Sequence, residues 1–344
     1  MGSTHAVKVI ADRALAARDE AELRWAATAT GAGPLEAWIH HFRVAGRLTV
    51  NFHPDRLARS GLTAAAGLAS EGSYKTQWVT GVSGGSRSAV RNGERQRFEH
   101  EFFAGAYDSV APSSGEHPVY GSFDMLFDEH GGSPRFGSSY LILAPHVRDR
   151  TTLCLGDSHV QPGDVGTFSE PSSICAGLAE QASRHDLLNR HLGTDVLLDA
   201  LNGSYQLRRA SRDLDGYVEI QVHGGISLRD DVEAIVLDPS FRGTDVDRDL
   251  TNAAKLYGCK LSWHVGSVLA VNSVPNDFRG PTMSAVARRV AGPEETISAH
   301  AIGLAASRER FDEPTPLGDS PDSILQQLKY LWHTLLAHGH DTPP

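Results

Sequence analysis

Cysteine is scarce in this 344-residue chain, which holds only Cys154, Cys175 and Cys259. Three cysteines, odd in number and far apart, fit neither a disulfide framework nor a Cys-x-x-Cys zinc site, so a reducing cytoplasm is the expected compartment. The chain also lacks an apolar run of about 18 residues, and residues 1–10 contain no apolar signal core. These absences predict no membrane partner and no classical secretion, while delivery by a specialised secretion system stays open.

The chain also lacks any long stretch rich in Lys and Arg. Lys and Arg total 32 against 42 Asp and Glu, which gives a formal net charge of −10. Because nucleic-acid binding depends on a positively charged surface, no nucleic-acid partner is expected. The 17 histidines show no HExxH pattern or ligand-triad spacing, so a metal hydrolase is disfavoured and no metal site is predicted. With 40% hydrophobic and 22% charged residues, the chain otherwise has the composition of an ordinary globular protein.

Helical patterns lie mainly at the two ends of the chain. Apolar residues recur at helical spacing over residues 6–27, 34–44, 245–257 and 320–339. We therefore predict a helical cap over residues 1–46, a sheet-rich core over 47–245 with a helical insertion near 172–192, and a mixed, then helical extension over 246–344. Residues 312–319 contain two prolines and are the expected linker.

Short runs of β-branched and aromatic residues, separated by Gly, Pro and Ser clusters, are typical of strands. They predict strands at residues 48–52, 74–82, 118–126, 138–144, 217–222, 232–237 and 260–265. The predicted fold class is therefore α+β.

Polar clusters follow two of these runs. LTVNFHPDR places Asn51, His53 and Arg56 around a proline, either as a turn with an Asp55–Arg56 ion pair or as a ligand-binding strand edge. YKTQWVTGVSGGSRS carries Thr80 and then the glycine-rich segment 81–86. The backbone amides of that segment could hold a phosphate or form a plain turn, and the spacing matches neither a Walker loop nor GxGxxG.

Two further clusters flank the later strands. GGSPRFGSSYLIL places Arg135 and Phe136 before a strand, where they could face a ligand or form a bulged strand start. In GYVEIQVHGG, strand alternation puts four polar residues on one face, namely Tyr217, Glu219, Gln221 and His223. Such a row is either a solvated surface or the floor of a polar cleft, and the sequence alone favours the surface.

These four clusters together resemble a bacterial family catalogued as a domain of unknown function, which is similar to effectors that ADP-ribosylate threonine on ubiquitin. The resemblance covers residues 48–244 and implies an ADP-ribosyltransferase-like split β-sheet core with N- and C-terminal helices. It also implies that NAD is the substrate and ubiquitin the acceptor protein. In that family plan a basic residue ends the first core strand, a Ser/Thr-rich segment follows, and a catalytic Glu lies on a late strand.

The resemblance assigns roles to residues of this chain. Glu219 becomes the catalytic carboxylate, and His223 becomes the group that could remove the acceptor proton. The expected NAD-binding residues are Asn51, His53, Arg56, Thr80, Ser83, Gly84, Tyr217 and Gln221. The chain has Gly84 where the family favours Asn. Cleavage of the nicotinamide–ribose bond builds positive charge on the sugar, which a carboxylate near the 2-hydroxyl stabilises.

The residues around Glu219 bear on the acceptor. Enzymes that modify arginine carry Glu-x-Glu, whereas this chain has Tyr217 two positions before Glu219. A hydroxyl acceptor is therefore expected, with transfer of ADP-ribose to threonine. The alternative is a catalytically inactive NAD- or ubiquitin-binding module of the same fold.

Overall fold

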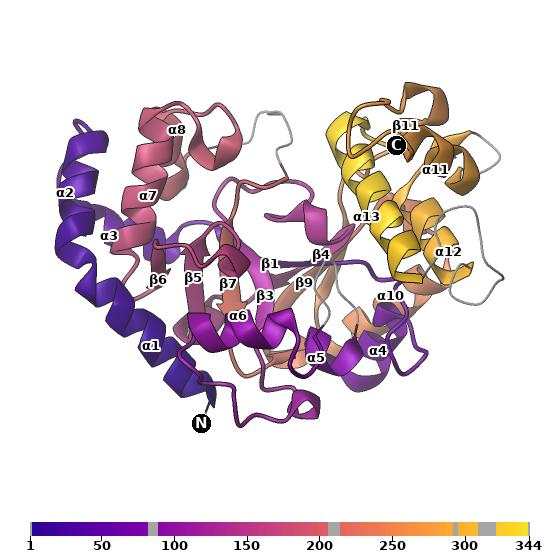
Figure 1. Ribbon diagram of the computed structural model, residues 1–344, viewed down its shortest axis with the longest axis horizontal. Coiled ribbons are helices and arrows are strands. Elements are labelled where there is room, and N and C mark those ends of the chain that lie inside the picture. Colours follow the sequence, from indigo (N-terminus) through magenta and orange to yellow (C-terminus); the bar gives the residue numbers. More distant parts are fainter. Residues whose placement is uncertain (1, 82–88, 206–213, 292–294, 309–320, 343–344) are drawn as a thin grey trace.

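In the computed structural model, which describes residues 2–81, 89–205, 214–291, 295–308 and 321–342, eight strands form one sheet (Figure 1). Their order across the sheet is β10-β9-β4-β1-β3-β7-β5-β6. The strands are β1 (Arg47–Phe52), β3 (Val119–Asp124), β4 (Ser139–Leu143), β5 (Thr151–Leu155), β6 (Val165–Thr167), β7 (Val218–Val222), β9 (Val232–Leu237) and β10 (Lys260–Trp263). Neighbouring strands are antiparallel except β9 and β10, which are parallel.

Helices gather at both ends of the sheet (Figure 1). Near β5 and β6 lie α1 (Gly2–Ala16), α2 (Arg18–Thr28), α3 (Leu35–Val44), α7 (Ser172–Ser183) and α8 (Thr194–Leu201). Towards the other end lie α10 (Asp245–Tyr257), α11 (Met283–Val290), α12 (Ala299–Arg308) and α13 (Pro321–His338). The short helices α4 (Ala64–Glu71), α5 (Gln77–Thr80), α6 (Glu94–Phe102) and α9 (Leu228–Asp231) complete the set. Two small two-stranded sheets pair β2 (Ser73–Tyr74) with β8 (Ile226–Ser227) and β11 (Leu269–Ala270) with β12 (Thr296–Ile297).

The two faces of the sheet differ in chemistry. Alternation in register puts Leu48, Val50, Leu153 and Ile220 on one face, where they join the larger hydrophobic core. The opposite face holds a row of polar and small side chains, including Thr49, Asn51, Ser122, Cys154, Glu219 and Gln221. A second, smaller apolar cluster around Phe102 and Phe103 includes Cys154 and covers part of this polar face.

The α+β class is confirmed, but the sheet is not split. Strand β1 hydrogen-bonds to both β3 and β4, so the strands are joined into one sheet. The sheet also continues past residue 245, the expected end of the core, because β10 pairs with β9. The expected linker, residues 312–319, lies outside the described residues.

The expected strand over residues 74–82 is wrong, since residues 77–80 form the short helix α5. Its first residues follow an extended Thr76, and the Thr80 amide and hydroxyl both donate to the Thr76 carbonyl. Gly81 ends the turn with φ of +67°, a conformation that glycine adopts without strain. The alternating pattern that predicted a strand over residues 74–82 therefore does not form one, because residues 77–80 form a helical turn.

The expected helix over residues 6–27 is two helices, α1 and α2, that meet at Ala17. Leu15 and Leu23, which the sequence placed among the apolar positions, are 60% and 74% exposed. Ile10 and Trp25, two other apolar positions of the same pattern, are buried, as is Ala6. Within the described part of the chain, no helix is both long and apolar enough to span a bilayer.

Candidate active site

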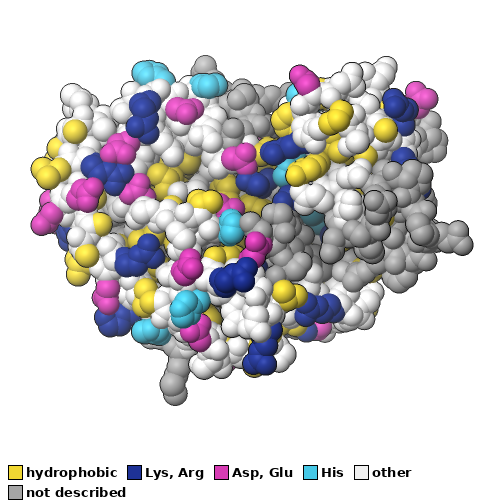
Figure 2. Space-filling model, viewed as in Figure 1, with side chains coloured by type: hydrophobic (Ala, Val, Ile, Leu, Met, Phe, Trp, Pro, Cys, Tyr) yellow, Lys and Arg dark blue, Asp and Glu magenta, His cyan; other side chains and the backbone are white. Residues whose placement is uncertain are grey.

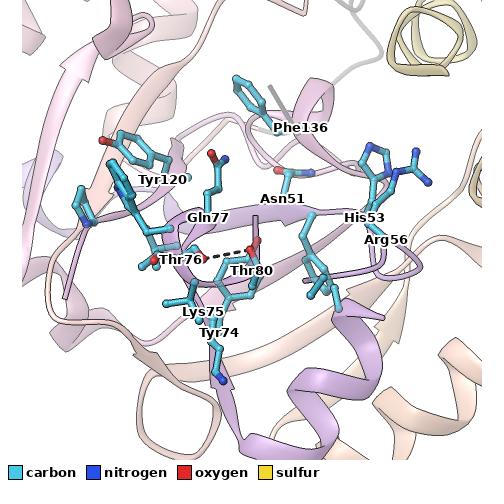
Figure 3. A pocket seen from close by; sticks show the side chains of 18 of the residues that line it. Asn51, His53, Arg56, Tyr74, Lys75, Thr76, Gln77, Thr80, Tyr120 and Phe136 are labelled. Atoms are coloured by element: carbon cyan, nitrogen blue, oxygen red, sulfur yellow. Dashed lines mark hydrogen bonds between the residues drawn. The ribbon is translucent and has the colours of Figure 1, made fainter. Parts of the chain in front are cut away.

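A cavity of about 250 Å³ opens on the polar side of the sheet, between α4, α5 and the ends of β1, β3 and β7. Figure 3 shows part of its lining, with Tyr120 at one end of the view and His53 and Arg56 at the other. Charged side chains of both signs contribute to the lining: the cations are Arg56, Lys75, Arg95, Arg135 and Lys329, and the carboxylates are Glu71, Asp157 and Glu219. The cavity is therefore a concave site with more cations than carboxylates.

The fold brings five of the predicted site residues together. Asn51, His53, Arg56, Thr80 and Glu219 all line this cavity, although they come from β1, its following turn, α5 and β7. By contrast, Tyr217, Gln221 and His223 do not line it. Ser83 and Gly84 lie outside the described residues.

Glu219 supplies a buried carboxylate to the cavity, and hydrogen bonds fix one of its two carboxylate oxygens. Its Oε1 accepts hydrogen bonds from the Gln221 Nε2 at 2.8 Å and from the Ser158 backbone N–H at 3.3 Å. The residue is only 4% exposed, and burial, with the nearby charge of Asp157, raises its pKa to about 7. At neutral pH this carboxyl is thus poised between its acid and its base form.

The expected surface position of the β7 polar row is wrong, because all four side chains are buried. His223 is 0% exposed, its Nδ1 contacts the Tyr107 hydroxyl at 2.5 Å, and its Nε2 contacts the Thr152 hydroxyl at 2.9 Å. The same Thr152 hydroxyl lies 2.7 Å from Gln221 Oε1. This chain of contacts ends at Glu219, so Gln221 and His223 position the carboxylate from behind the cavity.

His223 is also poorly suited to accept or donate a proton at the cavity. Burial, together with the charge of Arg150, lowers its pKa to about 3, so the imidazole is neutral at physiological pH. Phe103 packs edge-on to its ring and Tyr107 stacks over it. We therefore assign His223 a positioning role, which differs from the role that the resemblance implied.

Asn51 supports a glycine-rich loop at the cavity wall. Its Nδ2 donates to the carbonyls of His130 and Gly137 at 2.7 and 3.2 Å, and its Oδ1 accepts from the Ser133 N–H at 3.3 Å. Gly137 lies so close to β1 that an added Cβ would be about 2.1 Å from the Phe52 carbonyl carbon. Asn51 therefore acts through the loop, which presents Arg135 and Phe136 to the cavity.

His53 and Arg56 line another wall of the cavity, at the end away from Tyr120 (Figure 3). The Arg56 Nη1 lies 3.4 Å from Asp55 Oδ1, which is the turn ion pair that the sequence allowed, and the Arg56 side chain lines the cavity as well. Burial, with the positive charge of Arg56, holds the pKa of His53 well below its usual range. The structure thus supports both interpretations of the segment at once.

Sequence reasoning missed a buried carboxylate beside the cavity. Glu99, on α6, is 2% exposed and accepts hydrogen bonds from the Trp78 indole at 3.1 Å, the Tyr120 hydroxyl at 3.0 Å and His117 Nδ1 at 3.0 Å. Arg95 lies 3.5 Å from the same carboxylate and contributes to the cavity wall. No local pattern around residue 99 signals this role, because three of its partners come from two other segments, α5 and the start of β3.

Other missed residues lie on distant elements. Asp157 and Ser158 come from the 3-10 turn η4 (Ser158–Val160) and the residue before it, next to Glu219. Lys329 comes from α13 and Arg135 from the 3-10 turn η2 (Pro134–Phe136). Only Arg135 and Phe136 had a signal in the sequence, since they belong to the GGSPRFG cluster. Among the described residues, no group of three or more His, Cys, Asp or Glu side chains could hold a metal ion.

The chain is similar to proteins of two mycobacterial phages. It is 24% identical over 131 residues to the Gene 2 protein of Mycobacterium phage L5, and 26% identical over 142 residues to the Gene 2 protein of Mycobacterium phage D29. These stretches cover 36% and 38% of this chain but 46% and 49% of the phage proteins, so the chain spans about half the length of these relatives. Residues 47–338 match the family described as "Protein of unknown function (DUF3626)", and the chain therefore belongs to the DUF3626 family.

Proposed function

We propose that this protein is a mono-ADP-ribosyltransferase, which cleaves NAD and transfers ADP-ribose to a threonine hydroxyl of ubiquitin. The observation that carries the proposal is the position of Glu219, a buried carboxylate with a pKa of about 7 in a cavity with more cations than carboxylates. NAD combines a diphosphate, which cations bind, with a ribose carbon that becomes cationic when nicotinamide leaves. The cavity offers groups for both. The likeness to ubiquitin-modifying effectors in the sequence supports the choice of acceptor.

The reaction can be written with the groups of this chain. The bond between nicotinamide nitrogen and the ribose carbon breaks, and nicotinamide leaves as a neutral molecule with the bonding electron pair. The Glu219 carboxylate stabilises the positive charge that develops on the ribose. The acceptor oxygen then bonds to the same carbon and releases a proton. Since His223 is buried behind the cavity, Glu219 itself is the group placed to take that proton, and its pKa of about 7 suits the task.

Tyr217 bears on the type of acceptor. It stands two positions before Glu219, where arginine-modifying enzymes have a second Glu, and its ring packs edge-on to Phe136 in the cavity wall. No carboxylate at that position is available to orient a guanidinium. A hydroxyl needs no such partner, because it can attack a nearly formed cation.

The test is incubation of the full chain with NAD and ubiquitin, followed by intact-mass spectrometry of ubiquitin and measurement of released nicotinamide. We expect an ADP-ribose adduct that fragmentation places on threonine and that resists neutral hydroxylamine. An adduct on arginine would reject the hydroxyl acceptor. NAD binding without nicotinamide release would reject the transferase and indicate the inactive binding module.

A further inference from the structure

Three cations from separate segments lie close together, and two of them, Arg135 and Lys329, line the cavity. They are Arg135 from η2, Arg279 from the loop before α11, and Lys329 from α13. Asp215 pairs with both arginines, and its Oδ2 lies 3.9 Å from the Arg279 Nη2. Among the described residues, Lys329 makes no ion pair of its own.

The charges in this cluster are not balanced. Burial and the positive charges of Arg135 and Arg279 lower the pKa of Lys329 to about 8. The carboxylates of Asp157 and Asp215 act in the opposite direction without restoring the ordinary value. Burial and the two neighbouring guanidinium groups therefore disfavour the charged form of Lys329, and a bound anion would favour it.

Polar atoms without partners surround the same cluster. The Nε atoms of Arg135 and Arg279 are buried and have no hydrogen-bond partner among the described residues. His333 is 1% exposed, and burial with the three neighbouring cations lowers its pKa to about 3, so its ring is neutral. Ser133 and Ser158, which line the cavity, also have unpaired hydroxyl oxygens. Since a buried polar group without a partner costs about 1–3 kcal/mol, so many in one place indicate a ligand that completes them.

The backbone of Arg279 gives independent support. Its φ of +60° lies in the left-handed region, which residues other than glycine, asparagine and aspartate seldom adopt. Such conformations persist where the surrounding structure requires them, often at ligand clamps. Here the conformation accompanies a guanidinium that shares Asp215 with Arg135.

We propose that Arg135, Arg279 and Lys329 bind a diphosphate group. Two guanidinium groups and an ammonium offer fixed N–H donors and a mobile point charge, which suit the oxygens of neighbouring phosphates. Arg56, one of the residues that the resemblance assigns to NAD binding, lies on another wall of the cavity, where it pairs with Asp55. This inference rests on the proposed function in one respect, namely that the diphosphate is that of NAD. A separate ligand that carries a diphosphate is the other source of the same chemistry.

Isothermal titration of the full chain with inorganic pyrophosphate tests the site directly. We expect Arg279→Ala and Lys329→Ala each to raise the Kd for pyrophosphate at least tenfold. Arg248→Ala is the matched control, because it removes the same charge from an exposed position on α10, and its Kd should stay within twofold of wild type. The two test residues lie on different segments, so misfolding of one variant, seen by circular dichroism, leaves the other as a test. Pyrophosphate that fails to bind, or binds equally to wild type and both variants, would overturn the proposal.

Titration with ADP-ribose and with nicotinamide riboside, which has no phosphate, distinguishes the source of the diphosphate. A parallel loss of ADP-ribose affinity in both variants, with riboside binding unchanged, supports NAD as the source. If the two variants lose affinity for pyrophosphate but keep their affinity for ADP-ribose, the result supports a separate diphosphate ligand. If the variants lose pyrophosphate but wild type never releases nicotinamide from NAD, the diphosphate site stands and the transferase proposal fails.

Discussion

Replacing Glu219 by Gln should stabilise the folded chain at alkaline pH while it removes nicotinamide release. The wild-type carboxyl has its pKa raised from 4.5 to about 7 by burial and by the charge of Asp157. The folded chain therefore binds this proton more tightly than the unfolded chain does. Stability falls as the pH rises from about 4.5, and the loss is complete once the pH exceeds about 7.

The size of the effect follows from the shift. At 1.36 kcal/mol per pKa unit, ionised Glu219 lowers the free energy of unfolding by about 3 kcal/mol above pH 7. Gln carries no charge at any pH, and its Oε1 can still accept from the Gln221 amide and the Ser158 N–H. Glu219→Gln should thus match wild type near pH 5 and exceed its stability by about 3 kcal/mol at pH 8.5.

Urea unfolding at pH 5 and pH 8.5 measures the difference. Glu101→Gln, an exposed position on α6, is the matched control and should show no such dependence on pH. The same Glu219→Gln protein should bind NAD nearly as wild type does but release nicotinamide about 100-fold more slowly or worse, because the charge acts when the ribosyl cation develops. An equal stability difference at both pH values would refute the electrostatic argument. Turnover within tenfold of wild type would refute the catalytic assignment.

Three further predictions address the other walls and the pH dependence. Arg56→Ala should raise the KM for NAD about tenfold with little change in kcat, since a charge-assisted contact is made before and during reaction; an unchanged KM would leave Arg56 only its ion pair with Asp55. Asn51→Ala should cost about 2 kcal/mol or more in urea unfolding, because three backbone groups of the loop over residues 130–137 lose their partner, and a loss below 0.5 kcal/mol would contradict this. The pH profile of kcat/KM for nicotinamide release should rise to about pH 7 as Glu219 ionises and fall above about pH 8 as Lys329 loses its proton, and a flat profile would argue against both assignments.

Much of the sheet could be predicted because its strands carry local signals. The runs around Val50, Leu141 and Val236 are rich in β-branched or aliphatic residues, and they form β1, β4 and β9. The run around Trp78 has similar alternation but forms a turn of helix, which ends at Gly81 in a left-handed conformation and whose indole hydrogen-bonds to Glu99. A tertiary contact of that kind overrides a short pattern, and no local rule predicts it.

The candidate site could be predicted only where its residues lie near one another in the sequence. Strand alternation placed Glu219 in a polar row, and only the family resemblance gave it a catalytic role. The burial of that row at His223 depends on the segment around Tyr107, which is distant in the sequence. Likewise, Arg279 and Lys329 meet Arg135 only through the packing of the C-terminal helices. Sequence reasoning treated those helices as an extension outside the core. Figure 2 shows why surface charge gives no clue either, since the face it presents carries acidic and basic side chains intermixed.

Two groups of buried polar atoms on this side of the sheet differ in whether other protein atoms satisfy their hydrogen bonds. This difference indicates which group supports the site and which is available to bind a ligand. His223, Thr152 and Gln221 satisfy one another in a closed chain of hydrogen bonds that ends on Glu219. The Nε atoms of Arg135 and Arg279 have no hydrogen-bond partner among the described residues. A satisfied network fixes geometry, whereas unsatisfied donors lower stability unless a ligand completes them. The first group therefore holds the carboxylate in place, and the second leaves a site for an anionic ligand next to it.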